Sequence, residues 1–493
     1  MIDRRGLLKA AALSPLATSA LATSAFAATP PSAPPSAAPS AAGKADYTIR
    51  MVQGLVELSP DQIVSTTVYN GQFPDPLLRF KEGQRVTVDS FNDTDTPELL
   101  HWHGQKIPSD VDGAAEEGSP AIAPHNMRRI SFVPRPSGFR FYHSHNFAGS
   151  DLTRGTYSGQ AGPVYIEPAN NRGAYDQEIF LVLKEFLPTF SRGGDMASNA
   201  LAGQMQPNLR EIGKQADAQG QIKTKGYEVG YGLFSINGRI LGKGETLRVK
   251  QGQRVLFHAL NASATEIRSL ALPGHKFRVI ALDGNRVATQ AEVPALWLGT
   301  GERVSAVVEM NQPGVWVMGD LADDDRSRGM GIVVEYAGAT GTPQWSAPPP
   351  FRWDYTAFGR KPAHEPKPDE TINMLIVKHN GAVNGFNQWT VNGITFSVDN
   401  MRPFYTVQQG RRYRLRVRNG SDDIHPMHLH RHSFELVRVA GKPTSGVVKD
   451  VVMLGGYQEI EMDFVADNPG RTLFHCHQQL HMDFGLMAMF DYA

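Results

Sequence analysis

Three stretches of the sequence share one pattern of hydrophobic and polar positions. Each begins with an Asn-Gly pair, runs through a segment of alternating apolar and polar residues, and passes a central glycine into a second alternating segment. The pairs stand at 70–71, 237–238 and 392–393, and the second segments end at Asn92, Asn261 and Asn419. Alternation with a period of two is typical of β-strands, and Asn-Gly is a preferred tight turn between them. The pattern therefore predicts three copies of one β-structural unit.

The spacing of these copies predicts the domain organisation. The Asn-Gly pairs lie 167 and 155 residues apart, and a chain of 493 residues suggests three domains at about 150 residues each. Long amphipathic helical patterns are scarce, so we predict an all-β fold of three Greek-key barrels or sandwiches in series. Turn residues at 167–171 and a proline-rich stretch at 344–367 mark the boundaries. The predicted domains are 44–170, 171–345 and 367–493, with a connector at 346–366.

The first 43 residues differ in composition from the rest. Residues 1–27 combine a charged start, a short apolar stretch and an Ala-Phe-Ala end, which is typical of a secretory signal cleaved after Ala27. Arg4 and Arg5 resemble a twin-arginine signal, so we predict export to the periplasm. An ordinary signal or a membrane anchor is the alternative, but Pro15 and many hydroxyl residues disfavour a stable transmembrane helix. Residues 28–43, rich in proline, serine and alanine, are predicted to be a disordered tether.

The composition excludes several classes of function. The 49 basic residues balance the 49 acidic ones, so neither a nucleic acid nor an anionic membrane is expected as a partner. The single cysteine, Cys476, excludes an internal disulfide and any zinc site built on paired cysteines. Beside this one cysteine stand 16 histidines. Their distribution indicates metal chemistry.

Ten of the histidines fall into four clusters in the first and third predicted domains. The clusters contain His101 and His103; His143 and His145; His425, His428 and His430; and His475, His477 and His481. Residues i and i+2 of a strand share a face, so each of the four His-x-His pairs presents two imidazoles side by side. Eight imidazoles exceed the capacity of one ion, which predicts a multinuclear cluster between the two domains. A solvated histidine-rich surface is the alternative, but it does not require repeated pairs.

Cys476 lies between two of these histidines and points to the opposite face of its predicted strand. With His425 and His481 it makes a set of two imidazoles and one thiolate, which is the arrangement of a blue copper site. Such a site exchanges single electrons. The backbone from Cys476 to His475 and His477 would connect it covalently to the cluster.

With these residues in view, the chain from about Tyr47 onward resembles the three-domain multicopper oxidases, the laccases and bacterial copper or iron oxidases. The resemblance rests on His-Trp-His-Gly at 101–104, His-Ser-His at 143–145, His-Pro-Met-His-Leu-His at 425–430 and His-Cys-His-x3-His at 475–481. It implies cupredoxin domains and four copper ions per chain. The implied ligands are His425, Cys476 and His481 for type 1 copper, His101 and His428 for type 2, and His103, His143, His145, His430, His475 and His477 for the two type 3 ions.

The resemblance also implies roles for residues beside the ligands. Leu486, ten residues after Cys476, takes the axial position as a non-coordinating residue that raises the reduction potential; Met487 is the alternative. Asp112 matches an acidic residue that serves protons and cluster electrostatics, or else it only caps the turn before Gly113. Many bacterial relatives have Glu where this chain has Met482, so the second proton route stays open. Roles for Glu116, Glu117, Trp353 and Tyr355 also stay open.

The implied reaction couples four one-electron oxidations of a donor to reduction of O2 to two waters, with Asp112, Cys476, His475 and His477 as the catalytic residues. Laccase-like members oxidise phenols and aromatic amines near the exposed edge of a type 1 histidine. Metallo-oxidases bind Cu(I), Fe(II) or Mn(II) at nearby carboxylates or methionines. The 16 methionines form no run, which favours the laccase-like hypothesis. A non-catalytic copper-binding scaffold is the remote alternative, and a monomer with no stable membrane anchor is expected.

Overall fold

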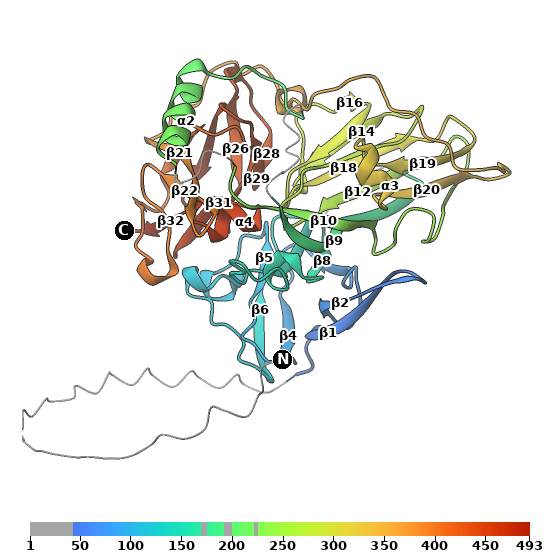
Figure 1. Cartoon of the computed structure of the whole chain (residues 1–493), viewed down its shortest axis with the longest axis horizontal. Helices are drawn as coiled ribbons and strands as arrows, with labels where there is room; N and C mark the ends of the chain where they lie inside the picture. The colour runs from blue at the N-terminus through green and yellow to red at the C-terminus, as the bar shows by residue number, and fades with distance from the viewer. Residues whose placement is uncertain (1–42, 169–174, 192–199, 221–224) are drawn as a thin grey trace, which may run out of the picture. The chain divides into compact units, whose positions relative to one another are not determined.

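The computed structural model describes residues 43–168, 175–191, 200–220 and 225–493. The predicted signal peptide and nearly all of the predicted tether lie outside the described residues. Residues 44–493 form one compact unit, whose strands run from blue to red along the chain in Figure 1. Among the described residues, no helix has both the length and the apolar character needed to cross a membrane.

The first stretch of the chain forms two four-stranded sheets. One has the order β2 (Gln62–Tyr69), β1 (Tyr47–Ser59), β4 (Val86–Asn92) and β6 (Asn126–Phe132). The other has the order β3 (Leu78–Lys81), β8 (Ala161–Glu167), β7 (Gly138–Ser144) and β5 (Leu100–His103). Side chains such as Val88, Trp102 and Val164 are fully buried in one core cluster that both sheets share.

The second stretch forms a seven-stranded and a five-stranded sheet. The larger one has the order β10 (Glu228–Ile236), β9 (Gln177–Ser191), β12 (Arg254–Asn261), β18 (Arg303–Glu309), β14 (Phe277–Leu282) and β15 (Asn285–Arg286), and β16 (Glu292–Val293) also pairs with β14. The smaller one has the order β11 (Leu247–Val249), β20 (Gly331–Tyr336), β19 (Val315–Gly319), β13 (Arg268–Ala271) and β17 (Ala295–Leu298).

The third stretch repeats this arrangement. Its larger sheet has the order β22 (Phe386–Val391), β21 (Glu370–Val383), β24 (Arg412–Asn419), β30 (Glu459–Val465), β26 (Phe434–Val439) and β27 (Lys442–Pro443), and β28 (Val448–Lys449) pairs with β26. Its smaller sheet has the order β23 (Tyr405–Val407), β32 (Met487–Tyr492), β31 (Thr472–Cys476), β25 (His425–Leu429) and β29 (Val451–Leu454). The all-β prediction of three repeated units is confirmed, while the exact domain boundaries stay a prediction.

The asparagines that mark the sequence repeat hold equivalent places in the three units. Asn70, Asn237 and Asn392 all have positive φ angles of 52–54°, as a tight Asn-Gly turn requires. Each side-chain amide donates to a carbonyl of the neighbouring strand, at Thr48, Phe180 and Asn373 respectively. The sequence repeat is therefore a repeat of side-chain hydrogen bonds as well as of strands.

In the described part of the chain, four α-helices join the strands: α1 (Ser109–Asp112), α2 (Pro207–Gln219), α3 (Asp323–Ser327) and α4 (Gln479–Asp483). Helix α2 lies between strands of the second unit in sequence, yet it packs on β21 of the third, as Figure 1 shows. Gly213 permits this approach, because a Cβ there would lie 2.6 Å from the Gly420 carbonyl oxygen. The second stretch of the chain thus covers part of the third.

Candidate metal centres

The Cys-His-His set, consisting of His425, Cys476 and His481, is brought together at one end of the third unit. Cys476 Sγ lies 3.7 Å from His425 Nδ1 and 3.6 Å from His481 Nδ1, and the two nitrogens are 3.2 Å apart. An ion bound at about 2.0–2.3 Å from each atom spans such separations. His425 and Cys476 come from the paired strands β25 and β31, and His481 comes from α4.

The surroundings of this set are apolar. Leu486 is fully buried in the same core cluster as Cys476, whereas Met487 belongs to a different cluster with Leu473 and Met489. This placement supports Leu486 rather than Met487 as the axial neighbour. The Trp389 ring packs at 4.7 Å from the His425 ring and 4.4 Å from the His481 ring.

The expected exposed edge of a type 1 histidine is not present. His425 is 0% exposed and His481 is 1% exposed. The buried Trp389 ring covers both imidazoles, and the His425 Nε2 lies 3.0 Å from the Ser421 hydroxyl. A donor in solution therefore cannot touch either ring, and electrons must enter across at least one intervening side chain.

The eight-histidine cluster, formed by the four His-x-His pairs, lies where the first and third units meet. His101 stands opposite His143 in the β5–β7 pairing, and His428 stands opposite His475 in the β25–β31 pairing. Rings from the two units stack on each other, with centroids 4.2 Å apart for His101 and His430 and 3.8 Å apart for His103 and His428. The prediction that all four pairs converge is confirmed by this geometry.

Hydrogen bonds orient the imidazoles of the cluster. The Nδ1 atoms of His143, His428 and His475 each lie 2.8 Å from a backbone carbonyl oxygen, which can only accept. Each Nδ1 therefore carries the proton and leaves Nε2 as an unprotonated ligand atom. His103 is reversed, because its Nε2 lies 3.1 Å from the Asp450 carboxylate and its Nδ1 faces His143.

Several features of the cluster fit bound metal ions. Among the described residues, the Nε2 atoms of His101 and His428 and both ring nitrogens of His145 and His477 are buried without a hydrogen-bond partner. The Nε2 atoms of His430 and His475 face each other at 2.9 Å. Neighbouring lone pairs repel each other unless a cation binds them, and unpaired buried polar atoms are costly. The chain's residues therefore fit the ions that the family resemblance implies.

The protonation states agree with this interpretation. Burial lowers the pKa of His428, His430 and His477 well below the ordinary value, and lowers that of His475 to about 4, so these imidazoles are neutral at pH 7. Neutral imidazole is the form that binds metals. Burial raises the pKa of the Cys476 thiol, and a coordinated metal ion deprotonates such a thiol.

Asp112 joins the two halves of the cluster. Its fully buried Oδ2 atom lies 3.0 Å from Nδ1 of His101 and 3.0 Å from Nδ1 of His430. The residue ends α1, and Gly113 follows with φ of 95°, where a Cβ would lie 1.8 Å from the Leu100 carbonyl oxygen. Asp112 therefore stands at the turn, as the alternative held, but its carboxylate contacts two predicted ligands.

Replacement of Asp112 by asparagine is expected to lower kcat by about 10²–10⁴-fold while copper content is retained. Asparagine keeps an oxygen that can accept from a histidine but cannot carry a proton, and positioned acid–base groups contribute rate factors of this size. Steady-state oxygen uptake and metal analysis would measure both effects. Asp110→Asn, on the exposed face of the same helix, is the matched control and should leave kcat unchanged. Wild-type kcat in Asp112→Asn would contradict a proton role.

Asp450 contacts two histidines of the cluster, and the sequence analysis did not predict this. Its carboxylate lies 3.1 Å from Nε2 of His103, and its backbone carbonyl lies 2.8 Å from Nδ1 of His428. Arg303 holds both carboxylate oxygens at 2.6 Å, and Arg140 lies 3.2 Å from Oδ2. Residues of all three units thus converge on one buried ionic network that supports two ligands of the cluster.

Two more acidic side chains lie beside the cluster. Glu117 Oε1 lies 3.4 Å from His430 Nδ1, and Glu116 Oε2 lies 3.9 Å from His145 Nδ1. Burial raises the pKa of Glu117, and it raises the pKa of Glu116 to about 6. Asp483 is partly exposed, and its carboxylate accepts hydrogen bonds from Gly149 and Gln479.

Two histidines outside the predicted ligand sets, and the two aromatic residues whose roles stayed open, have other partners. His125 is exposed and pairs with Asp95, and His432 contacts the Tyr492 hydroxyl through Nε2 and the His430 carbonyl oxygen through Nδ1. Trp353 and Tyr355 are each only 1% exposed, and the Tyr355 hydroxyl donates to Glu302, so neither residue borders a channel open to solvent.

A Cys-His-His set beside an eight-histidine cluster fits a copper protein. Family models described as multicopper oxidase match residues 54–171, 211–334 and 366–493. The chain belongs to the multicopper oxidase family, and it is an oxidoreductase with copper as its cofactor.

Individual relatives agree with the family. Multicopper oxidase MmcO of Mycobacterium tuberculosis is 28% identical over 441 residues, covering 87% of this chain and 84% of the relative. Laccase-3 of Thanatephorus cucumeris is 23% identical over 560 aligned positions, covering 92% of this chain and 91% of the relative. The structure of a multicopper oxidase from Pseudomonas thermotolerans shares the fold with a TM-score of 0.67 at 24% identity, covering 91% of this chain and 100% of the other.

Proposed function

We propose that this chain is a laccase-like multicopper oxidase whose donors are phenols or aromatic amines. His425, Cys476 and His481 would hold type 1 copper, His101 and His428 type 2, and His103, His143, His145, His430, His475 and His477 the two type 3 ions. Bound copper supplies one-electron oxidation of the donor and four-electron reduction of O2 to water. Asp112 holds protons beside His101 and His430, and the Cys476 backbone connects the two ligand sets through His475 and His477.

The carboxylates near the Cys-His-His set are the observation that distinguishes an organic donor from a metal-ion donor. Asp422 and Asp423 precede His425, where a metal-ion donor would need free acidic ligands. Lys378 Nζ lies 2.5 Å from Asp422 and 2.8 Å from Asp423, and Lys225 lies 3.5 Å from Asp422. These ammonium groups already neutralise the carboxylates, which disfavours binding of Cu(I), Fe(II) or Mn(II) there.

Aromatic side chains near the same set favour an organic donor. Phe484 stacks on Phe386 at 4.6 Å, and Phe190 packs against Phe386 at 5.1 Å. All three are partly exposed. The Phe484 carbonyl accepts a hydrogen bond from the Trp389 backbone, and the Trp389 ring contacts both predicted type 1 imidazoles. An aromatic donor could dock on this group of phenylalanines. An electron leaving it would then pass through the Trp389 indole to reach the predicted type 1 imidazoles.

Oxygen uptake by the copper-loaded protein tests the proposal, with 2,6-dimethoxyphenol and Cu(I) at matched concentrations. Rapid uptake with the phenol and little with Cu(I) is the expected result. A preference for Cu(I) would make the chain a metallo-oxidase, and uptake with neither donor would favour a non-catalytic copper scaffold.

Asp422→Asn should leave the rate of phenol oxidation within about twofold of wild type. Asp422 is 43% exposed, and the buried Lys378 keeps Asp423 as a partner at 2.8 Å, so the replacement should cost little stability; a phenol requires no carboxylate ligand. Phe386→Ala is the matched comparison and should raise KM for the phenol, since it removes stacking surface. A large loss of activity in Asp422→Asn, with Phe386→Ala unaffected, would instead favour a metal-ion donor.

We further propose that residues 1–27 are a cleaved twin-arginine signal and that the folded chain works as a periplasmic monomer. Replacement of Arg4 and Arg5 together by lysine should leave the protein in the cytoplasm, as cell fractionation would show. Lys9→Arg, in the same segment, should be exported normally. Undiminished export of the Arg4→Lys, Arg5→Lys double variant would contradict the twin-arginine route.

A further inference from the structure

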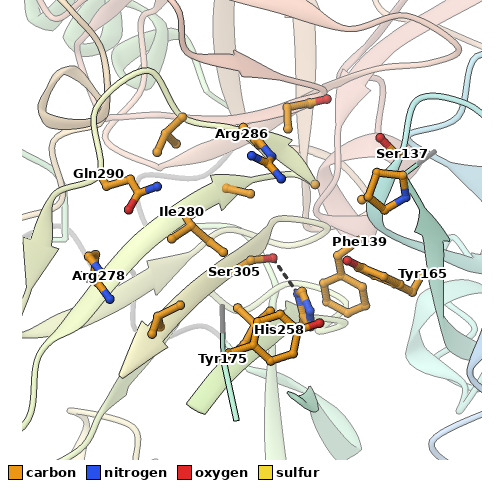
Figure 2. A pocket seen from close by; sticks show the side chains of 18 of the residues that line it. Ser137, Phe139, Tyr165, Tyr175, His258, Arg278, Ile280, Arg286, Gln290 and Ser305 are labelled. Carbon is orange, nitrogen blue, oxygen red and sulfur yellow. Dashed lines mark hydrogen bonds between the residues drawn. The ribbon is translucent and has the colours of Figure 1, made fainter. Parts of the chain in front are cut away.

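A pocket of about 660 Å³ lies at the junction of the three units, and none of its lining residues is a predicted copper ligand. Its lining comes from β7 and β8 of the first unit, β12, β14 and β18 of the second, and Val448 of the third. The volume is within the range of small-molecule sites, which often lie at domain junctions. Figure 2 shows Phe139 and Tyr165 across the pocket from Arg278.

The pocket carries an excess of positive charge. Arg254, Arg278 and Arg286 all line it. Only Arg278 has a carboxylate partner among the described residues, Glu309 at 3.6 Å, and that carboxylate is 60% exposed. The guanidinium groups of Arg254 and Arg286 make no hydrogen bond or ion pair with any described residue. The Asp176 carboxylate accepts a hydrogen bond from the backbone amide of Arg254, not from its guanidinium group.

Glu178, an acid that contacts the lining residues Tyr175 and His258, is already neutralised. Glu178 lies 2.5 Å from the Arg79 guanidinium and accepts a hydrogen bond from the Tyr175 hydroxyl. His258 Nε2 lies 3.3 Å from Glu178, and its Nδ1 lies 2.7 Å from the Ser305 hydroxyl. Both ring nitrogens of His258 are therefore engaged, so this imidazole offers the pocket ring surface rather than hydrogen bonds.

Most of the remaining lining is apolar or aromatic, and Ser137, Asn285 and Gln290 are polar members of it. Leu256, Ile280 and Val307 supply aliphatic surface between the arginines, and Tyr165 and Tyr175 supply aromatic rings. The Tyr165 hydroxyl makes no hydrogen bond to a residue in the described part of the chain, so it is available as a donor. Two guanidinium groups and one phenol thus surround an apolar floor.

We propose that this pocket binds a small aromatic carboxylate. Guanidinium groups without partners recognise carboxylates through charge-assisted and bidentate hydrogen bonds. The aliphatic floor and the tyrosine rings suit a planar apolar body, which inorganic anions lack. The site is separate from the proposed oxidation of donors, so a ligand bound there is not the electron donor.

Isothermal titration of the copper-loaded full chain with benzoate, benzamide and acetate tests this assignment. We expect saturable binding of one benzoate per chain, with at least tenfold weaker binding of neutral benzamide and of acetate. Removal of Arg254 and Arg286 together, by Arg254→Gln and Arg286→Gln, should weaken benzoate binding by at least about tenfold, since hydrogen bonds to charged groups contribute on this scale. Arg248→Gln, which removes a surface arginine outside the pocket, is the control.

Three outcomes would overturn the proposal: no saturable benzoate binding, equal affinity for benzamide, or equal affinity for acetate. Arg286→Gln alone guards against misfolding of the double variant, because Arg286 is exposed. All variants should oxidise 2,6-dimethoxyphenol at the wild-type rate. Loss of benzoate binding with intact oxidation in the double variant supports the proposed carboxylate site. If the carboxylate proposal fails, the proposed oxidase function is unaffected.

Discussion

Replacement of Cys476 by serine is expected to abolish the blue colour and to lower oxidation of phenols by more than about 10³-fold. The thiolate is the only sulfur ligand in the Cys-His-His set, with Sγ at 3.6–3.7 Å from both imidazole nitrogens. A serine hydroxyl cannot supply the copper–thiolate bond of a blue site. Loss of one member of a catalytic unit commonly costs this much or more.

Measuring the copper content of Cys476→Ser distinguishes loss of one copper ion from loss of all of them. The eight-histidine cluster lies on the other face of β31 and does not use Sγ, so Cys476→Ser should retain about three of four copper ions. His275→Asn removes a buried histidine of the second unit that contacts the Pro273 carbonyl and the Tyr336 hydroxyl and none of the predicted ligands, and it should keep the colour and all four ions. A Cys476→Ser protein that is still blue, or one that loses all its copper, would contradict the ligand assignment.

The sequence predicted the features that depend on local periodicity. The i, i+2 spacing placed the imidazole pairs, and the alternation around Cys476 separated its side chain from His475 and His477. Both held because strand geometry fixes which face a side chain takes. The Asn-Gly repeats likewise fixed three equivalent turns at Asn70, Asn237 and Asn392.

The features that the sequence did not predict depend on contacts between distant segments. Asp450 reaches His103 across 347 residues, and Glu117 reaches His430 across more than 300. Nothing in the residues around Asp450 marks it as different from other strand-end acids. The burial of His425 and His481 was also unforeseen, because their cover includes Trp389, which lies on a different strand and has no metal-binding motif of its own.

Replacement of Asp450 by asparagine is expected to destabilise the folded chain by about 3–5 kcal/mol, the range for removing one partner of a buried ion pair. The carboxylate is 0% exposed and neutralises Arg303 and Arg140, which are also fully buried. With asparagine at position 450, the buried guanidinium groups of Arg303 and Arg140 lose this carboxylate, and Asp283 is the carboxylate that remains near them. Urea unfolding, followed by two independent probes, would measure the change, since a chain of this size need not unfold in two states.

Asp93→Asn is the matched control for the stability change, because it removes an exposed ion pair in place of a buried one. Asp93 pairs with Arg50 at 2.8 Å, but these side chains are 35% and 47% exposed, so the loss should stay within about 1 kcal/mol. A second readout separates general destabilisation from a role at the cluster. Asp450 also orients His103, and losing such a partner weakens metal binding about 10–100-fold, so Asp450→Asn should release copper to a chelator sooner than Asp93→Asn. Equal stability and equal copper retention in the two variants would show that the Asp450 network supports neither the fold nor the cluster.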